Sequence, residues 1–375
     1  MEIFSKVYSK LKSKYSFRIF GFNISILTHI NRLFGPIRHI KNNGLLFSIS
    51  KNVFVSSSFR PVYARDIVSQ PVNHDVESSV AIVLQGPIVR KENFTFETIK
   101  IYQKIHPNAL IILSTWDDEP EKDIDQFKAL GIKVILSTMP HKPELYSVPH
   151  STKGSNVNLQ MLGVSRAIDL ASELGITFIA KTRTDARIYS RNFILQSIDL
   201  LEQYATSNDH GPIISSDYTS KHLVYSLNDF FHFGHINDMK IYWEYEDYST
   251  KLKSFFNNQI IINKTPVVAE IFLTARYLSK MGLDLNWTLE SWWNALKDFF
   301  IIVDSQSIDM YIEKNHDGFE QKGSQGGYCA PYSRSVSHAE WRLLKRGFIK
   351  GWLKNNGQDM QEKWHEVNGI LKKIR

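Results

Sequence analysis

Short apolar runs alternate with helix-like segments in the central part of this chain. Four runs rich in β-branched residues predict buried strands at 80–84, 109–113, 132–136 and 176–180. Apolar residues at helical spacing between these runs predict helices at 93–106, 117–130 and 156–174. Strands that alternate with helices in this way form a mostly parallel sheet with helices on both faces. The pattern therefore predicts an α/β fold.

Polar segments follow three of the predicted strands. Because the carboxyl ends of parallel strands lie at one edge of a sheet, we expect these segments to converge on a single ligand-binding rim. Their candidate binding residues are Gln85, Gly86 and Pro87 after the first strand, Thr115 and Trp116 after the second, and Lys181, Arg183 and Asp185 after the fourth.

The segment after the fourth strand carries the strongest chemical signal. Lys181, Arg183 and Asp185 alternate, so their side chains share one side of an extended chain. Two cations suit the oxygens of a phosphate, and a carboxylate suits a divalent ion that bridges them. The alternative is a solvated strand end with a local ion pair.

The other rim residues suit a nucleotide. Gly86 allows the backbone close to a ligand, and Gln85 can pair with a base edge or a ribose, although a plain turn is the alternative. Trp116 can stack on a base or pack in the core. Asn158 and Gln160 lie in the first turn of a predicted helix, where free N–H groups favour an anion or simply need a cap.

Composition and charge add two basic ends to this picture. The chain has 375 residues, 43% of them apolar, and a net charge of +7. Residues 1–75 hold eleven Lys and Arg against three acids, and residues 341–375 hold nine against three. Aromatic and aliphatic residues interleave with these charges, which is typical of helices that bind an anionic membrane surface; ordinary packing helices are the alternative.

These features predict three regions and exclude several classes. We expect a basic amphipathic N-terminal extension (1–75), the α/β domain (76–335) and basic C-terminal helices (336–375). No nucleic-acid motif accompanies the charge, so nucleic acid is not an expected partner. The single cysteine argues against disulfides and Cys-rich metal sites. With no membrane-spanning run and no signal-like h-region, we expect a cytoplasmic protein, peripheral on the inner face of the membrane.

Motifs of other enzyme classes are missing from the sequence. It contains no G-x-G-x-x-G after the first predicted strand, no P-loop, no G-x-S-x-G and no H-E-x-x-H. These absences disfavour a standard dinucleotide-binding fold, an α/β-hydrolase and a zinc protease.

Taken together, the motifs resemble the WavE lipopolysaccharide synthesis family, whose members are regarded as glycosyltransferases. The resemblance extends over residues 80–315, and its most specific part is the KTRTD sequence at 181–185. The further motifs, in chain order, are VLQGPI (83–88), PNALIILSTW (107–116), NVNLQ (156–160), NDFFHFGHINDM (228–239), AEIFLTARYL (269–278) and FFIIVD (299–304).

The resemblance implies a GT-A-like fold that binds a nucleotide-sugar donor. In such a fold, a carboxylate after a central strand holds Mn²⁺ or Mg²⁺ against the diphosphate, and Asp185 matches that position. Lys181 and Arg183 are the alternative source of positive charge. The implied activity is sugar transfer to a growing lipopolysaccharide or capsule glycan, with a glycan or lipid-linked glycan as acceptor.

An inverting transfer also needs a general base for the acceptor hydroxyl. Glu270 is the first candidate because it is an acid at the start of an otherwise apolar helix, although a favourable helix N-terminal charge explains it equally well. Asp229 is the second, because it precedes a strand-like segment. Two alternative functions stay open: a nucleotidyl- or phosphotransferase of polysaccharide synthesis, and a non-catalytic scaffold.

Overall fold

The chain consists of two compact units in the computed structural model, Met1–Pro61 and Val62–Arg375. The structure describes residues 39–41, 44–48, 54–58, 60–67, 75–139, 157–205, 210–221, 223–245, 269–313 and 335–347. Most of the two basic ends lies outside these residues, so the predicted membrane association stays a prediction.

The N-terminal unit contains a three-stranded antiparallel sheet in the order β1-β2-β3. Its strands are β1 (His39–Lys41), β2 (Gly44–Ser48) and β3 (Phe54–Ser58), with Lys41 opposite Gly44 and Gly44 opposite Ser58. The prediction of a helical N-terminal extension is therefore wrong for these residues. The Asn-Asn-Gly sequence at 42–44 is a turn signal, and serine-rich segments form helices poorly.

The larger unit is built on a seven-stranded sheet in the order β11-β9-β10-β7-β4-β5-β6. The strands are β4 (Val80–Gln85), β5 (Leu110–Trp116), β6 (Lys133–Ser137), β7 (Phe178–Arg183), β9 (Ile213–Ser216), β10 (His232–His235) and β11 (Phe300–Val303). β7, β4, β5 and β6 are parallel, β10 is antiparallel to both its neighbours, and β9 is parallel to β11. The predicted α/β fold with a mostly parallel sheet is confirmed.

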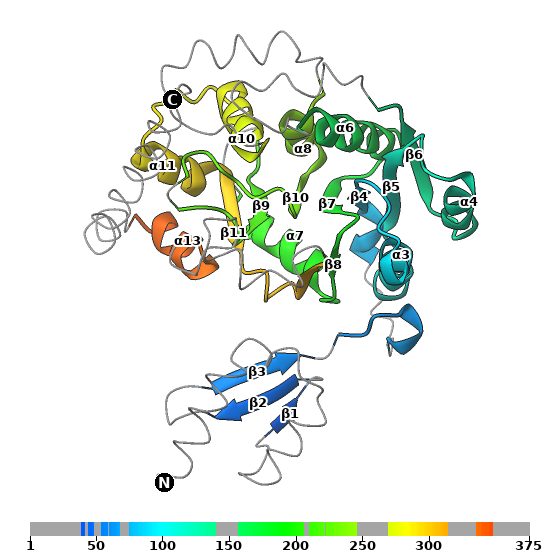
Figure 1. Cartoon of the computed structure of the whole chain (residues 1–375). Coiled ribbons are helices and arrows are strands. Elements are labelled where there is room, and N and C mark those ends of the chain that lie inside the picture. The colour runs from blue at the N-terminus through cyan, green and yellow to red at the C-terminus, as the bar shows by residue number, and fades with distance from the viewer. Residues whose placement is uncertain are drawn as a thin grey trace, which may run out of the picture. The chain divides into compact units, whose positions relative to one another are not determined.

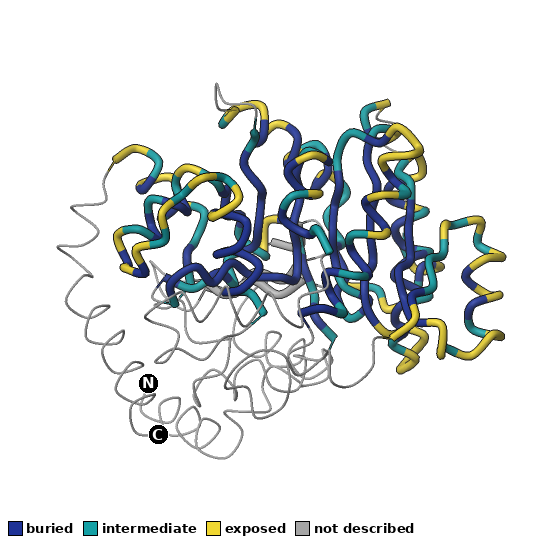
Figure 2. Tube along the Cα trace, turned by 90° about the horizontal axis from the view of Figure 1, so that it is seen from above, coloured by how far each residue is buried: buried dark blue, intermediate teal, exposed yellow. Residues whose placement is uncertain are grey.

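Helices cover both faces of this sheet. They are α3 (Phe94–Ile105), α4 (Glu121–Ala129), α6 (Val157–Glu173), α7 (Phe193–Gln203), α8 (Ile236–Trp243), α10 (Ala269–Lys280), α11 (Leu289–Phe299) and α13 (His338–Lys345). Figure 1 shows α6 and α8 on one face and α3 and α7 on the other. The central strands are almost entirely buried, and the exposed residues lie on the helices and the connecting loops (Figure 2). A parallel sheet needs this double cover because its strands are apolar on both sides.

Short elements complete the unit. They are the 3₁₀ helices η2 (Ala64–Asp66), η3 (Asp75–Ser79) and η4 (Lys91–Asn93), and the strands β8 (Ala186–Ile188) and β12 (Met310–Ile312), which pair antiparallel.

The described start of the basic C-terminal region belongs to the larger unit. The fully buried Trp341 on α13 donates its indole N–H to the carbonyl of Leu296 on α11 at 3.0 Å. Glu340 pairs with Lys221 and also closes a capping box with Ser337. α13 is therefore a packing helix, as the alternative interpretation of the C-terminal pattern stated.

Gly86 makes the tight turn that leads out of β4. Its φ is +131°, and a Cβ atom there would lie 2.8 Å from Thr184 Oγ1. We expect Gly86→Ala to lower the free energy of unfolding by about 1–3 kcal/mol, because it adds both backbone strain and a clash. Gly131→Ala is the matched control, since Gly131 has φ +76° but open space around it. Urea unfolding should show the larger loss for Gly86→Ala; equal losses would contradict the clash.

Candidate functional site

The three polar segments predicted to converge lie at one rim of the sheet. Gln85 at the end of β4 is opposite Ser114 of β5 on one side and Arg183 of β7 on the other. Two backbone hydrogen bonds extend the strand pairing beyond Gln85: Gly86 N donates to Ser114 O, and Thr184 N donates to Gln85 O. The predicted convergence is therefore confirmed.

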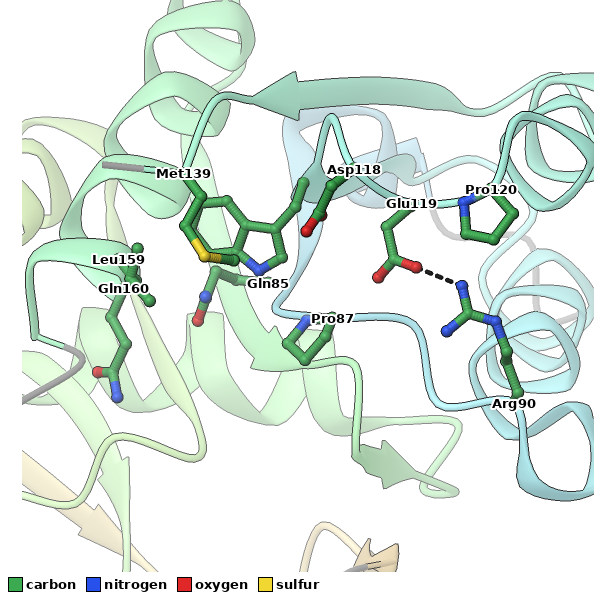
Figure 3. A pocket seen from close by; sticks show the side chains of 10 residues that line it. Gln85, Pro87, Arg90, Asp118, Glu119, Pro120, Met139, Leu159 and Gln160 are labelled. Carbon is green, nitrogen blue, oxygen red and sulfur yellow. Dashed lines mark hydrogen bonds and ion pairs between the residues drawn. The ribbon is translucent and has the colours of Figure 1, made fainter. Parts of the chain in front are cut away.

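A cavity of about 480 Å³ opens at the β4–β5 side of this rim. It is lined by Gln85, Pro87, Arg90, Trp116, Asp118, Glu119, Pro120, Met139, Leu159 and Gln160. Its lining combines apolar surfaces with two amides and a few charged groups, as Figure 3 shows. That mixture is typical of small-molecule sites. Four of the predicted binding residues, Gln85, Pro87, Trp116 and Gln160, line it.

Helix α6 approaches the strands closely beside this cavity. A Cβ atom on Gly163 would lie 3.1 Å from Gln85 Cγ and 3.3 Å from Ser114 Oγ. Ser114 Oγ also donates to Gly163 O at 2.7 Å. Because Gly163 lies one turn beyond Gln160, this contact fixes the first turn of α6 against the ends of β4 and β5. The sequence did not single out Gly163.

Two predicted binding residues lie beside the cavity without lining it. Thr115 is buried, and its hydroxyl donates to Glu119 Oε1 at 3.4 Å. Asn158 is also buried, in the first turn of α6. Thr115 therefore supports a residue of the cavity wall.

A charged cluster lies on the β7 side of the rim. Arg183 donates from Nε and Nη2 to the two carboxylate oxygens of Asp185 at 2.8 and 3.0 Å, and from Nη1 to Asp229 Oδ2 at 3.2 Å. Its guanidinium lies 5.0 Å from the centre of the Phe230 ring. Burial lowers the pKa of Arg183, but Asp229 and Asp185 outweigh it and leave the pKa raised. Arg183 thus stays charged and holds two carboxylates in place.

Asp229 reaches this cluster because β10 runs antiparallel to β7. The start of β10 therefore meets the end of β7, with His232 opposite Lys181. Asn228 holds the segment that leads into β10, because its Oδ1 accepts hydrogen bonds from Phe230 N at 2.9 Å and from Ser216 Oγ at 3.1 Å. Asn228 and His232 were missed as site residues, because neither ends a strand of the predicted sheet.

His232 holds the same backbone segment. Its Nε2 lies 2.6 Å from the Asn228 carbonyl, which makes Nε2 the protonated nitrogen. Burial, reinforced by the nearby charge of Lys181, lowers the pKa of His232 to about 3. The ring is therefore neutral at physiological pH, and it positions the segment that carries Asp229.

Lys181 differs from its predicted placement, because it is fully buried rather than presented at the rim. Its Nζ donates to the Asp229 carbonyl and lies 4.6 Å from the centre of the Trp243 ring. Burial lowers the pKa of Lys181 to about 8, although Asp229, Asp185 and Glu270 oppose this effect. Lys181 therefore fixes the backbone at Asp229 and contributes the field of its charge, but no exposed donor, to the rim.

The lowered pKa of Lys181 predicts a pH-dependent stability. Between pH 8 and 10.5 the unfolded chain binds more protons than the folded protein, so raising the pH through this window stabilises the fold. We expect the unfolding free energy of the wild type, relative to that of Lys181→Met, to increase by about 3 kcal/mol across this window. Urea unfolding of both proteins at several pH values measures the difference; a constant difference would contradict the buried charge.

Glu270 approaches the cluster from α10. One turn further along the same helix, Thr274 Oγ1 lies 3.4 Å from Leu227 N and 3.1 Å from Tyr242 Oη. Residues four apart share a helix face, so Glu270 faces the same segment. Its negative charge opposes the lowering of the pKa of Lys181 and adds to the raised pKa of Arg183. Glu270 therefore lies within electrostatic range of both cations. The structure thus brings Lys181, Arg183, Asp185, Asp229 and Glu270 together.

The composition of this cluster suits a divalent cation. Three carboxylates face two cations, so a diphosphate would meet a net negative surface unless another positive charge were present. Mg²⁺ is usually held by one or two carboxylates together with substrate phosphates, and Asp185 with Asp229 can supply such ligands. Among the described residues, no group of three His, Cys, Asp or Glu side chains forms a metal site made by protein ligands alone. The residues therefore fit an ion shared with a substrate.

A family model matches residues 80–289, which is more than half of the chain and covers the whole rim. This protein belongs to the WavE lipopolysaccharide synthesis family. The resemblance to this family, which rested on the KTRTD sequence and the other motifs, is confirmed. A comparison with curated proteins found no match.

Solved structures give distant matches to this WavE-family protein. A cytidylyltransferase from Leptospira borgpetersenii has a TM-score of 0.32 and 10% identity, over 73% of this chain and 94% of that one. 4-Diphosphocytidyl-2C-methyl-D-erythritol synthase from Anaerococcus prevotii has 0.30 and 10%, over 49% and 86%. A glycosyltransferase involved in the glycosylation of the major capsid of PBCV-1 has a TM-score of 0.29 and 13% identity, over 60% of this chain and 82% of that one. These TM-scores are too low to assign an activity.

The WavE-family chain has no helix, within its described residues, that is both long enough and apolar enough to cross a membrane.

Proposed function

We propose that this WavE-family protein is a GT-A-like glycosyltransferase of lipopolysaccharide or capsule synthesis. It transfers a sugar from a nucleotide-sugar donor to a glycan or lipid-linked glycan acceptor. The observation that carries the proposal is the rim itself, where a cavity of about 480 Å³ is lined by Gln85 of β4 and a cluster of five charged side chains begins at Arg183 on the neighbouring strand β7. The base and ribose would occupy the cavity, and the diphosphate would extend across Gln85 toward Arg183.

Each charged residue has a defined task in this transfer. The acceptor hydroxyl attacks the anomeric carbon, the bond from that carbon to the phosphate oxygen breaks, and the nucleoside diphosphate leaves. Arg183 and the field of Lys181 stabilise the negative charge that develops on the leaving group. A divalent ion held by Asp185 would supply further positive charge at the same oxygens. For an inverting reaction, a Glu270 carboxylate oxygen takes the acceptor proton, with Asp229 as the second candidate.

A donor-hydrolysis assay tests the proposal directly. The purified protein is incubated with UDP-, GDP- and CMP-linked sugars and Mn²⁺ or Mg²⁺, and the released phosphorylated product is identified. Release of a nucleoside diphosphate or monophosphate with free sugar supports sugar transfer. A second incubation supplies a nucleoside triphosphate and a sugar phosphate in place of the nucleotide sugar. Release of pyrophosphate from this mixture would instead indicate a nucleotidyltransferase. No turnover, together with no thermal shift with any nucleotide, would indicate a scaffold.

A further inference from the structure

One uncharged donor group lies directly beside the charged cluster. Asn228 precedes Asp229 in the chain and is more than nine-tenths buried, with 6% of its surface exposed. Its side chain accepts a hydrogen bond from Phe230 N at 2.9 Å. Because a backbone N–H can only donate, the atom that it contacts is the amide oxygen Oδ1. This contact therefore fixes which end of the amide faces the protein.

The amide nitrogen of Asn228 is the end that stays available. The Ser216 hydroxyl also bonds to Oδ1, at 3.1 Å, and no acceptor for Nδ2 is found among the residues that the structure describes. Nδ2 is not enclosed by protein atoms either, unlike Nδ1 of His232 on the same segment, which is enclosed and has no partner. An accessible amide nitrogen without an internal acceptor can donate to a ligand.

The backbone around this donor is held rigidly. Asn228 N donates to Thr219 Oγ1 at 3.2 Å, and the Asn228 carbonyl lies 2.6 Å from His232 Nε2 and 3.1 Å from Ser215 Oγ. Three further side chains thus fix the position of Asn228. A donor on such a support keeps its direction before a ligand arrives, which is what a specific binding site requires.

The place of this donor on the rim is where the transferred sugar would lie. The strand order is β4-β7-β10, so the start of β10 follows Arg183 in the direction that leads away from the cavity (Figure 1). With the base in the cavity and the diphosphate at Arg183, the sugar on the far phosphate reaches the start of β10. Asn228 is then in position to donate to one of its oxygens.

The charges around Asn228 decide what kind of sugar can bind there. An amide N–H donates to a hydroxyl oxygen as well as to a carboxylate oxygen, so Asn228 alone does not separate neutral from acidic sugars. Both cations of the cluster are already engaged, since Arg183 pairs with Asp185 and Asp229, and Lys181 is fully buried. A carboxylate on the sugar would therefore meet like charges without an available cation to offset them.

Acids continue along the rim beyond β10. Asp217 follows β9 and Asp304 follows β11, and both strands run in the direction of β7. Burial, together with the neighbouring charge of Asp304, raises the pKa of Asp217. Lys221, in the connection between β9 and β10, is paired with Glu340. The sugar side of the rim thus disfavours a negatively charged group.

Resting on the proposed function, we propose that Asn228 donates from Nδ2 to a hydroxyl oxygen of the transferred sugar and that this sugar is neutral. Nucleotide-linked uronic acids are rejected. Asn228 is thus a binding residue for the sugar and makes no contact with the nucleotide.

Matched donors test the selection by charge. UDP-glucose and UDP-glucuronic acid differ only at C6, as do GDP-mannose and GDP-mannuronic acid. In calorimetric titrations with Mg²⁺, we expect the neutral member of the pair that binds to have at least about tenfold higher affinity. Equal or tighter binding of the acidic member would overturn the inference and leave the proposed function intact, because a nucleotide sugar still binds. Binding of none of the four donors would overturn both.

Asn228→Ser tests the residue itself. Serine can still accept from Phe230 N in a similar turn, but it lacks the amide nitrogen. We expect the affinity for the neutral nucleotide sugar to fall about tenfold, while the affinity for the corresponding nucleoside diphosphate, which has no sugar, stays at the wild-type value. Equal losses for the two ligands would show that Asn228 only supports the backbone, and either that result or no loss would contradict the assignment.

Asn237→Ser is the matched control for this variant. Asn237 is an exposed asparagine in the first turn of α8, beyond the other end of β10. It should bind both ligands as the wild type does. Circular dichroism and urea unfolding of the two variants would show whether each is folded under the titration conditions.

Discussion

Asp185→Asn is expected to reduce sugar transfer by about 100-fold or more while leaving the protein folded. Asparagine keeps one acceptor for Arg183 but removes the negative charge that would hold a divalent ion, so the leaving diphosphate loses stabilisation. The measurement is kcat with a donor identified by the hydrolysis assay, over a range of Mn²⁺ and Mg²⁺ concentrations. The variant should also need more metal to reach its residual rate.

Asp199→Asn is the control for this experiment. Asp199 is an exposed acid on α7, outside the rim, and its substitution removes the same charge. It should retain wild-type transfer and metal dependence. Full activity of Asp185→Asn would remove the metal assignment, and wild-type activity in the presence of EDTA would show that Arg183 and Lys181 suffice for the leaving group.

Glu270→Gln is expected to lower kcat by about 10²–10⁴-fold and to leave the dissociation constant of the donor nearly unchanged. The substitution preserves the shape of the side chain and removes its ability to accept a proton. Asp229→Asn should behave differently, because Asp229 is tied to Arg183 and its loss should weaken donor binding as well. Steady-state kinetics together with titration of the nucleoside diphosphate separate the two effects.

The control for Glu270→Gln is Glu290→Gln. Glu290 also lies in the first turn of a helix, α11, and is exposed. If the charge at the start of α10 served only the helix, both variants should lose a little stability and neither should lose transfer. A large loss of kcat in Glu270→Gln alone would identify the base.

The parallel part of the sheet could be predicted because its strands are continuous apolar runs. Such runs must be buried on both faces, and the helices between them set the direction of each strand. The polar residues at the ends of β4, β5 and β7 could then be placed at one rim. The predicted convergence of Gln85, Trp116 and Arg183 followed from this rule alone.

The other half of the site could not be predicted in the same way. β10 has four residues, two of them histidines and one a glycine, so its pattern did not indicate a central strand. Nothing local shows that it inserts between β7 and β9. For the same reason the burial of Lys181 was not foreseen, because Asp229 and Trp243 cover it only after the chain has returned to the sheet.

The insertion of β10 has a consequence for protein synthesis. The ribosome releases β4 to β7, together with all the residues that line the cavity, well before β10 emerges, so the nascent chain presents the hydrogen-bonding edge of β7 without a partner. Unpaired strand edges promote aggregation. A fragment that stops before residue 232 should therefore be insoluble even though it carries the cavity, and a soluble minimal fragment with the cavity has to include β10.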